Sequence, residues 1–170
     1  MGTQGRKIVS SRGMNVEALI KLLNRALSEE WLAYYQYWIG AKVAVGVPRG
    51  EVIEELEQHA KEELEHAEKL VERIIQLGGT PVLEPREWYE LARCKYMSPK
   101  NPDLAAILDQ NIKGEQCAIA VYQELIDFAK GKDIVTCHMA IEILEDEVEH
   151  EQDLEDLRKD IATLCKCKKK

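Results

Sequence analysis

The chain carries one arrangement of acidic and imidazole side chains twice, and this repetition restricts its fold more than any other feature. Glu-x-x-His occurs at residues 63–66 and again at 147–150, and a single glutamate precedes each motif, Glu30 by 33 residues and Glu115 by 32. Each element of the second copy follows the first by 84 or 85 residues. A separation of three residues puts glutamate and histidine on one face of a helix, about one turn apart. The pattern therefore predicts two helical half-repeats related by a pseudo-twofold axis.

Turn and cap residues divide the chain into four long helices. Clusters of glycine and proline separate them, and the expected spans are about 15–44, 51–77, 101–131 and 133–164. Two of the connections are short, so the first helix is expected to lie antiparallel to the second, and the third to the fourth.

The remaining connection is long enough to travel the length of the bundle. It runs over 79–101 and is expected to contain a short helix near 86–93, with Pro85 at its start. We therefore expect an all-α four-helix bundle, two antiparallel helix pairs joined by a long crossover. The expected organisation is a flexible N-terminal segment (1–14), the bundle (15–164, crossover 79–101) and a basic C-terminal tail (165–170).

Metal-ligating side chains interrupt the apolar stripe of each predicted helix near its middle. An unpaired buried charge costs several kcal/mol, so four interruptions at one depth need a shared explanation. Two single glutamates and two Glu-x-x-His motifs form the known ligand set of di-iron and di-manganese helix bundles. The predicted metal ligands, which are also the predicted catalytic residues, are Glu30, Glu63, His66, Glu115, Glu147 and His150.

The ligand types favour iron or manganese. Four carboxylates and two imidazoles, with no thiolate, are unlike the ligands of a structural zinc site. Glu63 and Glu147 are the expected bridging pair. A centre held in this way can alternate between divalent and trivalent states, which favours redox chemistry with oxygen or peroxide over hydrolysis.

Two further pairs of residues flank these ligands. Glu62 and Asp146 directly precede the Glu-x-x-His glutamates, and each is expected to hold the imidazole N–H of the opposite helix; a solvated helix face is the alternative. Tyr37 and Tyr122 each follow a single glutamate by seven residues. They either shield the metals or simply fill the core.

Composition excludes several classes of function. The formal net charge is −8, which disfavours nucleic acid as a general partner. No apolar run reaches the length needed to span a bilayer, and residues 1–13 lack the apolar stretch of a secretory signal, so a cytoplasmic protein is expected. Five cysteines, an odd number, argue against a fully paired disulfide framework.

Longer segments resemble the ferritin-like proteins. Residues 23–37 look like the first helix of bacterioferritins, and 140–150 look like their fourth. Residues 115–122 and 131–133, together with Leu91-Ala92-Arg93-Cys94, resemble more closely the Dps-like proteins also called thioferritins. The resemblance covers about residues 15–160.

This resemblance implies a function and an assembly. Its members form hollow twelve-subunit cages that oxidise ferrous iron, preferentially with hydrogen peroxide, and store ferric mineral, which protects against oxidative stress. It implies two iron ions per subunit, with manganese as the other candidate, in a bacterioferritin-type centre within each subunit. It also implies a redox cysteine pair, Cys94 and Cys117. Cys117 lies about 200° around the helix from Glu115, so it is not an expected ligand; two small buried thiols are the alternative to a disulfide.

Departures from the relatives leave other functions open. Leu64 stands where bacterioferritin has its haem-ligating methionine, so no haem is expected at that position. A rubrerythrin-like or catalase-like enzyme that removes peroxide without storing mineral is one alternative. A DNA-protecting Dps protein is another, with basic residues near both ends, although the net charge disfavours it. The third is a metal-free helical scaffold.

Overall fold

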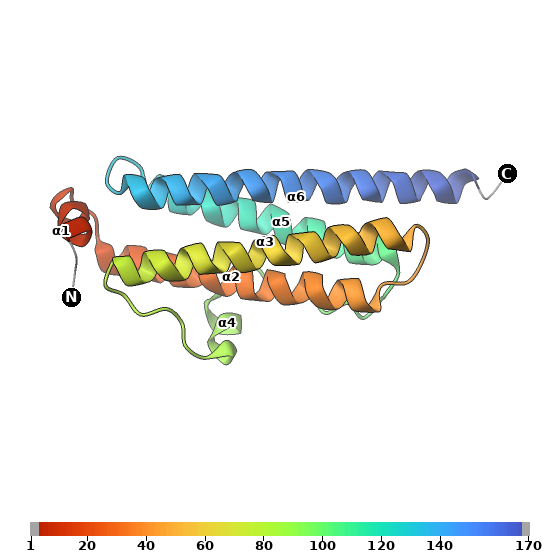
Figure 1. Cartoon of the computed structure of the whole chain (residues 1–170), viewed down its shortest axis with the longest axis horizontal. Helices are drawn as coiled ribbons and strands as arrows, with labels where there is room; N and C mark the ends of the chain where they lie inside the picture. The colour runs from red at the N-terminus through yellow and green to blue at the C-terminus, as the bar shows by residue number, and fades with distance from the viewer. Residues whose placement is uncertain (1–3, 168–170) are drawn as a thin grey trace.

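Four long helices lie side by side in the protein, a computed structural model that describes residues 4–167. Helix α2 (Val16–Val43) is antiparallel to α3 (Arg49–Gln76), and α5 (Leu104–Ala129) is antiparallel to α6 (Ile134–Cys167) (Figure 1). Two short helices, α1 (Gln4–Ser11) and α4 (Pro85–Leu91), complete the described part. The predicted all-α bundle of two helix pairs joined by a long crossover is confirmed.

Side-chain caps set two of the helix starts. The Asn15 side chain accepts a hydrogen bond from the Ala18 N–H at 3.0 Å, as expected for the cap of α2. Asp103 accepts from the Ala105 N–H at 3.0 Å, so α5 begins at Leu104, later than the predicted start at 101. The proline at 102 lies before the cap instead of in the first turn.

The two ends of the chain differ from the sequence-based expectation. Residues 4–11 form α1, within the segment 1–14 that was expected to be flexible. Val9 and Met14 anchor this segment by burying their side chains in the core, and Arg6 pairs with Glu17 at 2.9 Å. At the other end α6 continues to Cys167, into the expected tail of 165–170, while residues 168–170 lie outside the described residues.

Two apolar clusters fill the bundle and leave a polar layer between them. One cluster includes Leu27, Leu70 and Ile143, and the other includes Leu56 and Leu154. Along every long helix the predicted ligands lie where one cluster gives way to the other. Burial of apolar side chains on both sides therefore stabilises the position of the polar layer. No helix in the described range is long and apolar enough to cross a membrane.

A buried ion pair joins α3 to the start of α6. The Arg73 guanidinium contacts the Asp133 carboxylate at 2.6 Å and the Thr136 hydroxyl at 2.8 Å. Asp133 also accepts the backbone N–H groups of Val135 and Thr136, both at 3.2 Å, and so caps α6. Burial alone would raise the pKa of Asp133, but its hydrogen bonds to Thr136 and Arg73 outweigh this and lower it.

The crossover between α3 and α5 runs along α2 and carries α4 (Figure 1). The Glu29 carboxylate accepts the N–H groups of Arg93 at 2.6 Å and Cys94 at 2.8 Å, and Gln36 accepts the N–H of Met97 at 2.8 Å. A disulfide joins Cys94 to Cys117 on α5. The crossover is thus fixed to both α2 and α5.

Candidate metal centre

Each of the four long helices delivers part of the predicted ligand set to the polar layer. Glu30 comes from α2, Glu115 from α5, and one Glu-x-x-His motif from each of α3 and α6. The structure brings all six side chains together, and none is more than 3% exposed; they are Glu30, Glu63, His66, Glu115, Glu147 and His150.

The six side chains form two overlapping groups of four. Glu30 and His66 belong to one group, Glu115 and His150 to the other, and Glu63 and Glu147 belong to both. Within each group the candidate ligand atoms all lie within 4.8 Å of one another.

The imidazoles of this centre face the shared carboxylates. His66 Nδ1 is 3.4 Å from Glu63 Oε2 and 3.4 Å from Glu147 Oε1. His150 Nδ1 is 3.6 Å from Glu63 Oε1 and 3.7 Å from Glu147 Oε2. Each shared glutamate therefore turns one oxygen towards each histidine, which is the arrangement of a pair of bridging ligands.

Several buried polar atoms of the centre have no hydrogen-bond partner, and they show whether metal ions would fit here. Among the described residues, both carboxylate oxygens of Glu63 and of Glu147, one oxygen of Glu30, and Nδ1 of both site histidines are buried without a hydrogen bond. Buried polar groups are almost always satisfied, so this concentration in one place needs an explanation. Two cations among these atoms would satisfy them, and oxygen with imidazole nitrogen suits iron or manganese.

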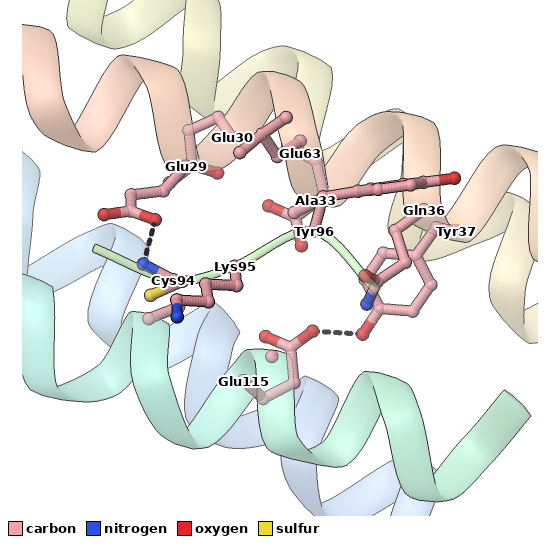
Figure 2. Close-up of a pocket in the computed structure, with 13 residues that line it drawn as sticks. Glu29, Glu30, Ala33, Gln36, Tyr37, Glu63, Cys94, Lys95, Tyr96 and Glu115 are labelled. Atoms are coloured by element: carbon pink, nitrogen blue, oxygen red, sulfur yellow. Dashed lines mark hydrogen bonds between the residues drawn. The ribbon is translucent and has the colours of Figure 1, made fainter. Parts of the chain in front are cut away.

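Contacts around the ligands run from one half of the chain to the other. His66 Nε2 lies 3.0 Å from Asp146, and His150 Nε2 lies 2.9 Å from Glu62. These contacts direct Nδ1 of each ring towards the centre. The hydroxyl of Tyr37 donates to Glu115, and that of Tyr122 donates to Glu30 (Figure 2 shows the first).

The cluster strongly perturbs proton binding. Burial, followed by repulsion from nearby carboxylates, raises the pKa of Glu30 and Glu115. Burial opposes the charged forms of Glu63 and His150, but short-range attraction between the carboxylates and the imidazoles prevails: it lowers the pKa of Glu63 and raises the pKa of His150 to about 12. The pKa of His66 is raised for the same reason. Cations bound here would displace protons, because metal and proton compete for the same atoms.

A small cavity reaches the centre from beneath the crossover (Figure 2). Its volume is about 40 Å³, and Glu30, Glu63 and Glu115 line its inner end, with Cys94 and Tyr96 at the crossover side. A water needs at least about 10–15 Å³, so the cavity admits only very small molecules.

Three polar residues near the centre were not predicted from the sequence. Glu29 and Gln36 hold the crossover, and His59, which lacks a glutamate three residues before it, is buried against the ring of His150. His59 interrupts the apolar stripe of α3 one turn before Glu63, and this position is the sequence signal that marks it.

Sequence and structure comparisons identify the family of this chain. The chain belongs to the ferritin-like family, since the family model for the Ferritin-like domain matches residues 20–164. The resemblance predicted from 23–37 and 115–122 is thereby confirmed.

Three relatives within this family show how similar the chain is to known proteins. The chain is 38% identical over 160 residues to the DNA protection during starvation protein of Pyrococcus furiosus, covering 92% of this chain and 85% of that one. It is 28% identical over 138 residues to the bacterioferritin of Rhodobacter capsulatus, covering 81% and 80%. It is similar in structure to a dodecameric thioferritin, the bacterioferritin-related protein of Bacteroides fragilis, with a TM-score of 0.93, 52% identity and coverage of 95% and 96%.

Proposed function

We propose that the protein is a ferroxidase, which oxidises ferrous iron at a di-iron centre and stores the ferric product. One observation carries this proposal: the candidate ligand atoms of four glutamates and two histidines converge between two apolar clusters, and in three of the glutamates and both histidines some of these atoms have no hydrogen bond. Membership of the ferritin-like family supports it independently.

The position of each residue indicates its role in binding iron. Glu30 and His66 would hold one iron, Glu115 and His150 the other, and Glu63 and Glu147 both. Two ferrous ions held here would each supply one electron to the oxidant. Asp146 and Glu62 orient the two imidazoles, while the hydroxyls of Tyr37 and Tyr122 orient the two glutamates that each face one ion.

The surroundings of the centre favour hydrogen peroxide or oxygen as the oxidant. The cavity beneath the crossover is too small for an organic substrate but has room for either molecule. Consuming peroxide together with ferrous iron would protect the cell against oxidative stress. The B. fragilis thioferritin is a dodecamer, and we propose the same hollow assembly for this chain.

The proposal is tested by removing ligands. Glu63→Ala and His150→Ala should each abolish rapid oxidation of ferrous iron, followed by the absorbance of the ferric product, while circular dichroism shows the helices intact. Glu65→Ala is the matched control, because Glu65 lies on the same helix but is exposed. Oxidation at the parent rate in either ligand variant would place the activity elsewhere.

Storage is tested separately from oxidation. With excess ferrous iron and peroxide, the native assembly should retain many more than two irons per chain, at a mass near twelve chains of 19.4 kDa. Retention of only two irons per chain would instead identify an enzyme that removes peroxide. Protection of DNA is the second candidate, favoured by the name of the P. furiosus relative and tested by a DNA mobility shift.

A further inference from the structure

A buried histidine outside the six-ligand centre lies between two carboxylates. His59 is on α3 and is 1% exposed. Its Nε2 lies 3.1 Å from Glu55 Oε1, one turn earlier on α3, and 3.9 Å from Asp153 Oδ2 on α6. This cluster is on the α3–α6 side of the bundle, whereas the crossover covers α2 and α5.

The histidine has no satisfactory hydrogen-bond partner among the residues that the structure describes. Neither ring nitrogen makes a hydrogen bond, and the 3.1 Å approach to Glu55 is not aligned as one. An imidazole this deeply buried normally has a partner. The unpartnered nitrogen and the two carboxylates therefore indicate a bound species that contacts all three groups.

We propose that Glu55, His59 and Asp153 form a third site for a divalent cation, distinct from the six-ligand centre. The candidate ligand atoms of these three side chains all lie within 4.8 Å of one another. Ligands at about 2.1 Å from a metal ion are separated from each other by roughly 3–3.5 Å. The His59–Glu55 distance of 3.1 Å lies in this range, and the His59–Asp153 distance of 3.9 Å is slightly longer. One imidazole and two carboxylates suit a transition-metal dication.

The contacts of His150 favour Glu55, His59 and Asp153 as the third site over a second possible group of ligands. His59, Glu62 and His150 also lie close enough to share an ion. However, His150 Nε2 already contacts Glu62 at 2.9 Å, and its Nδ1 faces the six-ligand centre. Glu55 and Asp153 have no such commitment to that centre, and their side chains are 27% and 44% exposed, so a cation reaches them from solvent.

The third site adjoins the six-ligand centre. The ring of His59 stacks on the ring of His150, with centroids 4.0 Å apart and an angle of 22°. A pocket of about 60 Å³ lies beside both rings, and Glu149 and Asp153 also line it. An ion in the third site is thus separated from a ligand of the centre by one ring-to-ring contact.

Cobalt(II) binding to the assembled, metal-free protein tests the proposal without any oxidation step, so failure of the ferroxidase function would not affect it. The double variant Glu55→Gln/Asp153→Asn should bind one cobalt fewer per chain than the parent. The carboxylates are changed instead of His59 because both are partly exposed and the core stays intact. Glu149→Gln removes one charge from the same pocket and should bind as many ions as the parent.

The position of the ion is decided by anomalous diffraction from crystals of the parent grown with cobalt. A peak between Glu55, His59 and Asp153 is expected, in addition to peaks at the six-ligand centre. Equal stoichiometry in the parent and the double variant, or no peak at this trio, would overturn the proposal.

Discussion

Reduction of the Cys94–Cys117 disulfide is expected to destabilise the protein without altering its native structure. The bond joins residues that are 23 apart in sequence. A cross-link of this span removes conformations from the unfolded chain and contributes about 3 kcal/mol at 25 °C through loop-closure entropy. In the folded state the Glu29 carboxylate still accepts two N–H groups from 93–94, so the crossover stays anchored. The free energy of unfolding should fall by about 3 kcal/mol.

Equilibrium unfolding in urea, with and without a reducing agent, measures this difference. Protein concentration must be held fixed, because the stability of an oligomer depends on it. Cys94→Ser should unfold like the reduced parent and should not respond to the reducing agent. Cys137→Ser is the matched control and should keep the full difference, since Cys137 is a half-buried free thiol.

The redox state of each sample is checked by blocking free thiols at once and mapping them by mass. Coincident unfolding curves for the fully oxidised and the fully reduced parent would refute the stabilising role of the bond. A native circular dichroism spectrum that changes on reduction would refute the anchoring role of Glu29.

Three further predictions concern charge and metal. Asp133→Ala should destabilise the protein by about 3 kcal/mol in urea unfolding, because it leaves Arg73 buried without its partner. Because the folded-state pKa of Asp133 is lowered, its ion pair contributes its full stability above the ordinary pKa of about 3.9, and this contribution is lost as the pH falls through the lower folded-state value. A difference in unfolding free energy between parent and variant that does not narrow as the pH falls below the ordinary value would contradict this assignment. Asp146→Ala should weaken cobalt(II) binding about 10- to 100-fold in calorimetric titration, since His66 loses the group that orients it. Removing metal with a chelator should lower the melting temperature, by about 5–10 °C against a 100-fold excess of metal over its Kd, and the shift should vanish in Glu63→Ala.

The fold and the convergence of the six candidate ligands could be predicted because both depend on periodicity along the chain. A stripe with a spacing of three and four identifies the buried face, and a charged residue within it is conspicuous. Glu63 and His66 satisfy this test within a single helix, and their repetition 84 residues later supports the same assignment.

Glu29 and the Arg73–Asp133 pair could not be predicted, because their partners lie on other elements. Glu29 is one of many acidic residues in a chain of net charge −8, and its N–H donors are more than 60 residues away. Arg73 and Asp133 are separated by 60 residues. Helix α1 was not predicted for a related reason: Val9 and Met14, the apolar residues that anchor its region, depend on an apolar cluster supplied by the bundle.

The exchange of contacts between the two halves has a consequence for how the centre assembles. Tyr37 and Glu62 of the first half contact Glu115 and His150 of the second, while Tyr122 and Asp146 of the second contact the corresponding residues of the first. This reciprocal pattern is that of an isologous dimer interface. The crossover joins the two halves in one polypeptide. The pairing of the halves is therefore governed by the effective concentration that the crossover, as a linker, imposes. Assembly of the six candidate ligands is therefore insensitive to dilution of the protein, whereas two separate half-chains would lose it as they dissociate.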